Sequence, residues 1–301
     1  MGHDHDHVHL RAGARHAGRL RTSFVLIISF LVVQVVVGVA AGSLALLSDA
    51  GHMATDALGL GMALAAISAA SRADHASHRT FGLYRLEILA ALANAVLLFG
   101  VAGYVFVEAI RRLGDPPDVA SMPVLVVGLI GLAVNMVAFL LLRQGAAESL
   151  NVRGAYLEVM SDALGSVGVI IAAIVMAVTG WGWVDPVVAA GIGVFILPRA
   201  WRLGRDAGRV LVQAAPAELD IDAVTAALGR LDEVTDVHDL HVWTLTSEMH
   251  VLTAHLTVDA VEHTQAVLAA AQTMLAAEFG LTHATLQVEV GANQNCDEMT
   301  W

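Results

Sequence analysis

Residues 155–179 read AYLEVMSDALGSVGVIIAAIVMAVT, an apolar run interrupted by two acidic residues. A run of this length can cross a bilayer as one helix, which takes about 20 residues. Similar runs cover residues 24–42, 44–70, 86–107, 122–142 and 184–201. The chain of 301 residues is 57% hydrophobic and only 15% charged, too little polar surface for a soluble globule. The sequence therefore predicts an α-helical membrane protein with six transmembrane helices.

Two of these runs admit another interpretation. Acidic residues lower the hydropathy of residues 44–70 and 155–179, so four spans with two interfacial helices is the alternative topology. The first run follows arginines and ends in small residues, as a cleaved signal peptide does. Its apolar stretch is longer than the hydrophobic core of a usual signal peptide and follows a long polar segment, so we expect it to remain as a span.

The net charge of −12 lies entirely in the last third of the chain. Residues 1–208 carry 14 arginines and 14 acids, whereas residues 209–301 carry 2 arginines and 14 acids. From Glu218 the pattern becomes short and alternating, with helices expected at 220–231 and 262–279 and strands at 234–245, 249–258 and 284–290. This order, αββαβ, predicts a small α+β domain of a size that commonly dimerises. Its acidity disfavours nucleic-acid binding.

We therefore expect three regions: a His-rich tail at 1–22, a six-helix domain at 23–208 and the acidic domain at 209–301. Arginines concentrate in the tail, in the second and fourth loops and after the sixth span, while the opposite side has only Arg111 and Arg112. The positive-inside bias places both termini and the acidic domain in the cytoplasm. The tract HDHDHVH at 3–9 is typical of weak, exchangeable metal binding, with an expression tag as the alternative.

Two of the spans carry acidic residues at a repeated spacing. In 44–70, His52 and Asp56 lie at i and i+4, on one helical face; in 155–179, Glu158 and Asp162 do the same. Ionised groups at membrane depth cost about 2.5 to 3.5 kcal/mol each, so they usually line a pathway or pair with one another. Residues 24–71 and 154–198 contain no Arg or Lys. The remaining compensation is protonation or a bound cation.

These four side chains offer one imidazole nitrogen and three carboxylate oxygens, a set that suits a tetrahedral Zn²⁺ site. Co²⁺ and Mn²⁺ fit the same set tolerably and Cd²⁺ less well. For any one of these acids, the alternative is a capped or protonated structural group. Asp49 lies one turn before His52 but outside the repeated spacing, and it is either a further ligand or a hydrogen-bond acceptor from Ser43, Ser48 or a neighbouring helix. Asn94 and Asn135 are expected to bond between helices.

Four segments resemble the cation diffusion facilitator family, most closely its bacterial zinc, cobalt and cadmium exporters. They are SLALLSDAGHM at 43–53, RTFGLYRLEILAA at 79–91, GAYLEVMSD at 154–162 and HDLHVW at 238–243. The resemblance implies a homodimeric, proton-coupled antiporter of the bacterial inner membrane, with a metallochaperone-like cytoplasmic domain at the dimer contact. It assigns the transport ligands to His52, Asp56, Glu158 and Asp162. Many zinc-specific members have histidine where Glu158 stands, which argues against strict zinc selectivity.

The resemblance also implies metal sites in the acidic domain, with ligands at His238 or His241, His255 and Glu289 and Cys296 as a further candidate. Residues an odd number apart face opposite sides of a regular strand, so at most one of His238 and His241 is expected in one site. Cys296 is the one cysteine, which excludes an intrachain disulfide. The loop DHASH at 74–78 is a weaker metal candidate.

The expected function is efflux of a divalent cation, Zn²⁺ first with Cd²⁺ and Co²⁺, and no resident cofactor. A membrane metalloenzyme is the alternative from another class. It is disfavoured because the sequence has no HExxH motif and no separate general base beside the four ligands. A metal sensor that does not transport is the third possibility.

Overall fold

The computed structural model describes residues 8–71, 81, 85–142, 150–246 and 249–291. Inside these ranges the side chains of 8–23, 62–71 and 150–159 lie outside the description, as do several isolated ones that include position 56. The chain divides into two compact units. One comprises Met1–Asp74 and Ala90–Gly204, and the other comprises His75–Leu89 and Arg205–Trp301.

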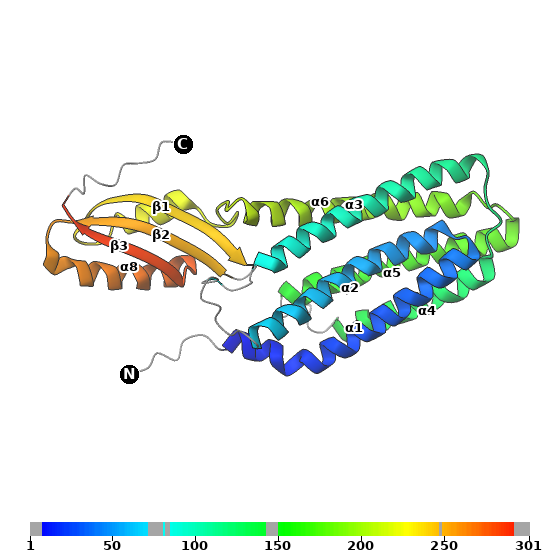
Figure 1. The fold of residues 1–301 in the computed structure, drawn as a ribbon, viewed down its shortest axis with the longest axis horizontal. Coiled ribbons are helices and arrows are strands. Elements are labelled where there is room, and N and C mark those ends of the chain that lie inside the picture. Colours follow the sequence, from blue (N-terminus) through cyan, green and yellow to red (C-terminus); the bar gives the residue numbers. More distant parts are fainter. Residues whose placement is uncertain (1–7, 72–80, 82–84, 143–149, 247–248, 292–301) are drawn as a thin grey trace. The chain divides into compact units, whose positions relative to one another are not determined.

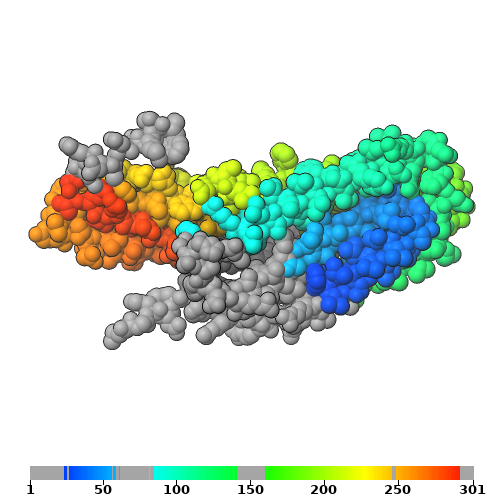
Figure 2. Space-filling model, in the orientation of Figure 1, coloured from blue at the N-terminus to red at the C-terminus, as the bar shows by residue number. Residues whose placement is uncertain are grey.

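Six long helices make up most of the first unit, as the sequence predicts (Figure 1). They are α1 (Val8–Ala41), α2 (Leu44–Ser71), α3 (Arg85–Gly114), α4 (Ser121–Leu142), α5 (Leu150–Thr179) and α6 (Val184–Leu211). Helix α1 packs against α2 and α4, and α4 packs against α5. Figure 2 shows the side chains of α3 (cyan to green) packed beside those of α1 and α2 (blue) on one face.

The outer surfaces of these helices are apolar, as lipid requires. Val36, Val96 and Ile110 are 60–70% exposed. Among the described residues, three helical segments are long and apolar enough to cross a membrane: Arg85–Gly114, Asp162–Thr179 and Val184–Leu211. Ile27–Ala41 and Ser121–Val137 are shorter apolar stretches. The unit is therefore a bundle of membrane helices with a buried interior of small residues and valines.

Helices α1 and α6 extend furthest beyond the runs that the apolar pattern predicts. Helix α1 begins at Val8, so the region expected as a tail is helical from that residue. Residues 8–22 are rich in Ala, Leu and Arg, which are good helix formers, and contain no Pro. Helix α6 continues to Leu211, ten residues beyond the predicted end at Trp201. Hydropathy marks where a helix leaves an apolar environment, which is not where its hydrogen bonding stops.

The start of α2 is fixed by a buried carboxylate from another helix. Asp185, in the first turn of α6, is fully buried. It accepts hydrogen bonds from the Ser43 hydroxyl and the Leu44 backbone N–H, both at 2.6 Å. The first N–H groups of a helix have no partner within the helix, and a carboxylate there also meets the positive end of the helix dipole. The contact ties the end of α2 to the start of α6.

The second unit contains the predicted α+β domain. Its elements are α7 (Ile221–Leu228), β1 (Val234–Thr246), β2 (Met249–Val258), the 3-10 turn η2 (Val261–His263), α8 (Thr264–Phe279) and β3 (His283–Val290). The sheet order is β1-β2-β3, with β1 antiparallel and β3 parallel to β2. The αββαβ prediction is confirmed, and α8 forms the crossover between the parallel strands (Figure 1).

The two faces of this sheet differ in character. Alternate β2 residues Leu252, Ala254, Leu256 and Val258 are buried in one apolar core with Val224 and Leu228 of α7 and with Val267, Ala271 and Leu275 of α8. Both helices therefore cover the same face. Thr253, His255 and Thr257 alternate with the core residues and point to the other face. The polar chemistry of the domain is placed on the face that these helices leave uncovered.

Strand β1 is not regular. Its register against β2 runs from His238↔His255 to His241↔Thr253, so three steps on β1 match two on β2. The extra residue is a β-bulge, and Asp239 within it has a φ of +49°, in the left-handed region. Because His255 and Thr253 lie on one face of β2, their partners His238 and His241 also share a face. The expectation that these two histidines face opposite sides is wrong, since it assumed a regular strand.

Candidate metal centres

The first centre lies inside the helical bundle, where α2 and α5 meet. His52 Nε2 on α2 lies 2.8 Å from Asp162 Oδ1 on α5. The side chains are 8% and 17% exposed, respectively. The repeated i, i+4 spacing predicts that these two helices face each other, and this pair shows that they do. Asp56 and Glu158 lie on the same two helices, but their side chains are outside the described residues.

Asp49 is occupied by a hydrogen bond from a neighbouring helix. The Gln34 side-chain amide on α1 donates to Asp49 Oδ2 at 2.7 Å, and both residues are buried. Gly165 of α5 is close as well, since a Cβ added there would lie 3.1 Å from Asp49 Oδ1. The hydrogen-bond interpretation of Asp49 therefore has direct geometric support, with α1 as the source of the donor. Ser43 bonds Asp185, and Ser48 bonds the Ala189 carbonyl.

The two intramembrane asparagines bond between helices, as expected. Asn94 on α3 donates to the Thr55 carbonyl on α2 at 3.5 Å. Asn135 on α4 donates to the Ser166 hydroxyl on α5 at 3.4 Å. Both bonds reach one of the two helices that carry the acidic residues. They hold α2 and α5 in the bundle without joining the group at His52.

Sequence reasoning missed a basic residue beside this centre. Arg199 Nη1 on α6 lies 3.5 Å from His52 Nε2. The inference that no basic partner is available is wrong, because the count of basic residues ended at Pro198. Helical spacing would have indicated this position. Ile192, Ile196 and Ala200 form the buried stripe of α6, and Arg199 is three residues beyond Ile196. An arginine next to a buried stripe points toward the interior of the bundle.

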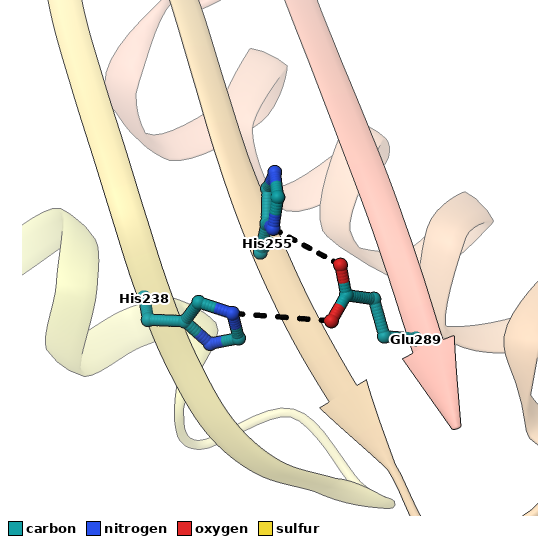
Figure 3. A group of neighbouring side chains, drawn as sticks. All are labelled: His238, His255 and Glu289. Atoms are coloured by element: carbon teal, nitrogen blue, oxygen red, sulfur yellow. Dashed lines mark ion pairs between the residues drawn. The ribbon is translucent and has the colours of Figure 1, made fainter. Parts of the chain in front are cut away.

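The second centre lies on the uncovered face of the sheet, with one side chain from each strand. His238 of β1, His255 of β2 and Glu289 of β3 each offer a ligand atom, and these atoms all lie within 4.8 Å of one another (Figure 3). His255 Nδ1 is 3.0 Å from Glu289 Oε1, and His238 Nε2 is 3.9 Å from Glu289 Oε2. Among the described residues, this is the one group of three or more histidine, cysteine and acidic residues that fits a metal ion.

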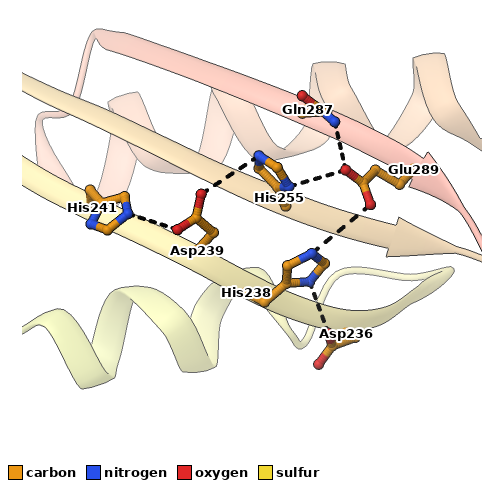
Figure 4. Close-up of polar contacts among 7 residues, drawn as sticks. All are labelled: Asp236, His238, Asp239, His241, His255, Gln287 and Glu289. Carbon is orange, nitrogen blue, oxygen red and sulfur yellow. Dashed lines mark hydrogen bonds and ion pairs between the residues drawn. The ribbon is translucent and has the colours of Figure 1, made fainter. Parts of the chain in front are cut away.

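Burial and outer contacts orient these ligands. The Glu289 side chain is only 6% exposed, and the Gln287 amide donates to its Oε1 at 2.6 Å. Asp236 Oδ2 lies 3.0 Å from His238 Nδ1, which leaves Nε2 turned toward Glu289 (Figure 4). A carboxylate behind a histidine fixes the ring and raises its basicity as a ligand. Two imidazoles and one carboxylate form a set that binds zinc with an open fourth position.

His241 stands apart from this group although it shares the face. Its Nε2 contacts Asp239 Oδ1 at 2.8 Å, and its side chain is 53% exposed. Asp239 Oδ2 in turn lies 3.8 Å from His255 Nε2 (Figure 4). The prediction named either His238 or His241, and the geometry brings His238 to His255 and Glu289. Cys296, the loop at 74–78 and residues 3–7 of the histidine tract lie outside the described residues.

Comparison with known proteins covers both units. Residues 20–212 match the model of the cation efflux transmembrane domain. Residues 216–290 match that of the cytoplasmic domain of cation efflux proteins. A solved structure titled as the metal-bound C-terminal domain of the CzcD transporter from Cupriavidus metallidurans is 37% identical in sequence over 24% of this chain and 100% of its own, with a TM-score of 0.23.

Full-length relatives match the chain nearly end to end. The metal cation efflux system protein CzcD of Cupriavidus metallidurans is 46% identical over 98% of this chain and 92% of its own. The zinc transporter ZitB of Escherichia coli is 39% identical over 96% and 93%. The cadmium, cobalt and zinc/H(+)-K(+) antiporter of Bacillus subtilis is 36% identical over 98% and 94%. The chain therefore belongs to the cation diffusion facilitator family of cation efflux proteins.

Proposed function

We propose that this chain exports divalent metal cations through a transport site formed by His52, Asp56, Glu158 and Asp162. The observation that carries the proposal is the contact between His52 Nε2 and Asp162 Oδ1, which joins α2 to α5 at 2.8 Å inside an apolar bundle. A cation bound there has ligands from two helices, so a movement of one helix against the other changes its coordination. Transport needs this property, because the ion must be released after it is bound.

Zn²⁺ is the first expected cargo, with Cd²⁺ and Co²⁺ as further cargoes. The relatives named above include a zinc transporter and a cadmium, cobalt and zinc antiporter. A set of one imidazole and three carboxylates is harder than the two-histidine sets typical of zinc-specific members, and affinity among divalent metals depends on such ligand differences. Glu158 is therefore the residue that broadens the range of cargo.

Proton exchange supplies the driving force in this proposal. The Bacillus subtilis relative is named as a cadmium, cobalt and zinc/H(+)-K(+) antiporter. Histidine and carboxylate ligands bind metal only when deprotonated, so metal binding releases protons. On the outer side, protons return to His52 and the carboxylates as the metal leaves. The inward proton gradient then drives the metal out of the cell.

The second centre fits regulation by the metal level in the cytoplasm. His238, His255 and Glu289 lie on one sheet face, where a bound ion ties all three strands together. We place the domain in the cytoplasm, both termini on that side, the helices in the bacterial inner membrane, and two copies in contact through the acidic domain. The matching family model is a cytoplasmic domain of cation efflux proteins. Metal at this centre then biases the dimer toward the transporting arrangement.

The test is metal-driven proton flux in proteoliposomes that contain the purified full chain. Asp56→Ala and Asp162→Ala each remove one ligand, and we expect Zn²⁺-dependent proton flux to fall to the level of empty liposomes. Asp206→Asn is the matched control, because that carboxylate is 62% exposed and contacts Arg205, so flux stays at the wild-type level. Wild-type flux in either alanine variant would exclude this transport site.

A further inference from the structure

We propose that Arg199 is a tethered competitor for the transported cation, a positioning residue that occupies the site between transport cycles. The inference rests on the proposed transport site and adds to it a group from a third helix. Its basis is the position of two described side chains around one nitrogen: His52 Nε2 lies 2.8 Å from Asp162 Oδ1 and 3.5 Å from Arg199 Nη1. The atom that would bind the metal is the one that a permanent cation already approaches.

Metal and guanidinium exclude each other at this nitrogen. An imidazole Nε2 offers one position: it either carries a proton that Asp162 would accept, or presents a lone pair to an N–H or to a metal at about 2.0–2.1 Å. The arginine stays protonated in proteins, so it keeps its positive charge whatever the state of the site. A divalent ion beside His52 would meet this charge at short range in a medium of low dielectric constant, where like charges repel strongly. Arg199 therefore has to withdraw before the cargo is fully coordinated.

The backbone at Arg199 is held in place by packing, whereas its long side chain can change position. Ile196 and Ala200 are 4% and 0% exposed, so the backbone of α6 at this point is packed into the bundle. The guanidinium is carried on a long flexible stem that can relocate while the helix stays in place. Helix α6 itself contributes none of the four proposed ligands. Arg199 therefore acts on the site from outside the ligand set.

This arrangement predicts that Arg199 weakens metal binding and speeds turnover. When the binding-competent state is only a fraction of the population, the apparent affinity falls by that fraction. Arg199 near His52 defines the incompetent state, so it weakens metal binding. The same charge also stabilises the emptied site, which favours release of the cargo. Removal of the charge should therefore tighten binding and slow turnover together.

The experiment measures Zn²⁺ affinity and Zn²⁺ flux in the full chain. The triple variant His238→Ala, His255→Ala and Glu289→Ala serves as the background, so that zinc binding reports the membrane site, and added His52→Ala identifies that site by its loss. In this background we expect Arg199→Gln to lower the zinc Kd about tenfold, as expected if the competent fraction rises from about one tenth to nearly one. In proteoliposomes both KM and the maximal flux fall. Arg199→Met, a second charge-free variant, gives the same result.

Two controls separate this role from a structural one. Arg199→Lys keeps the positive charge, and we expect it to keep the weaker binding of the parent protein. Arg202→Gln removes a charge three residues further along α6, where the side chain is exposed, and leaves the Kd and the flux unchanged. Unchanged or weaker zinc binding in Arg199→Gln and Arg199→Met, at a site that His52→Ala still abolishes, overturns the role of Arg199 alone. If His52→Ala removes no zinc site, the transport site and the inference fail together.

Discussion

The His52 side chain lies beside an acidic and a basic residue, and only the acidic neighbour could be predicted from the sequence. The contact with Asp162 follows from the spacing of His52, Asp56, Glu158 and Asp162, because i, i+4 pairs share a helical face whatever the tertiary structure. The contact with Arg199 depends on how α6 packs beside α2, a relation between segments 147 residues apart. Local periodicity predicts which face a side chain occupies, and packing decides which neighbour it meets.

Glu158→His tests the role of the added carboxylate. The substitution replaces an oxygen ligand with a softer nitrogen ligand, which favours Zn²⁺ over Co²⁺ and Mn²⁺ in a tetrahedral site. We expect the ratio of zinc flux to cobalt flux to rise several-fold in proteoliposomes, with zinc flux retained. The same measurement with Glu87→His, at the first turn of α3, gives the ratio of the parent protein. An unchanged ratio in Glu158→His would contradict the selectivity assigned to this position.

At the scale of single elements, the ends of helices and the irregularities of strands escaped the sequence pattern. The element order of the acidic domain was predictable because alternation of period two and helical periodicity are local. The cap of α2 was not, since Asp185 reaches Ser43 and Leu44 from another helix. The bulge in β1 was not either. The sequence HDLH at 238–241 carries no glycine to mark it, and Asp239 adopts the left-handed conformation instead.

Asp185→Ala tests the cap of α2. The change leaves the Ser43 hydroxyl and the Leu44 N–H buried without their acceptor, at a cost of about 1–3 kcal/mol for each such group. We expect a clear fall in the melting temperature of the full chain in detergent. Asp220→Ala removes the equivalent contact at the exposed N-terminus of α7, where the Ala223 N–H is capped at 3.1 Å. Water replaces that bond, so its loss of stability should be smaller, and the reverse order would contradict the importance of the buried cap.

His238→Ala and His241→Ala test which histidine of β1 serves the second centre. The assay is zinc bound per chain after gel filtration, in a His52→Ala background that disables the membrane site. His238→Ala should lose zinc, because its Nε2 lies 3.9 Å from Glu289 Oε2. His241→Ala should retain it, because that ring is half exposed and contacts Asp239. Zinc loss in His241→Ala with retention in His238→Ala would show that the group in Figure 3 is not the site.

At the scale of the whole molecule, the net negative charge lies outside the membrane-spanning part of the chain. Residues 1–208 balance 14 arginines with 14 acids, and residues 209–301 carry the whole excess of −12. Composition alone predicted this division, since it depends on counts rather than on geometry. The pairing of charges did not follow from counts, because a balanced total says nothing about which arginine lies beside which acid. The two arginines make different contacts. The Arg112 guanidinium donates to the Gly42 carbonyl at 2.6 Å, whereas Arg199 lies beside His52.

The single cysteine gives a direct test of the proposed orientation. Cys296 lies within the acidic domain, so a membrane-impermeant thiol reagent should leave intact cells unlabelled and should label inside-out vesicles. Asp115→Cys in a Cys296→Ser background places the thiol in the connection between α3 and α4, on the opposite side of the membrane in this topology. That variant should be labelled in intact cells. The opposite labelling pattern would invert the orientation and with it the direction of transport.

The bulge at Asp239 also bears on how the length of this strand can vary. Elsewhere in a regular strand, loss of one residue turns every following side chain to the other face of the sheet. Here three residue steps along β1 match two along β2, from His238↔His255 to His241↔Thr253. Deletion of Asp239 would leave both pairs in place and set Leu240 opposite Ala254, toward the apolar core. The bulge therefore makes this the position where β1 can lose one residue. The residues that face the apolar core and His238 would keep their faces of the sheet.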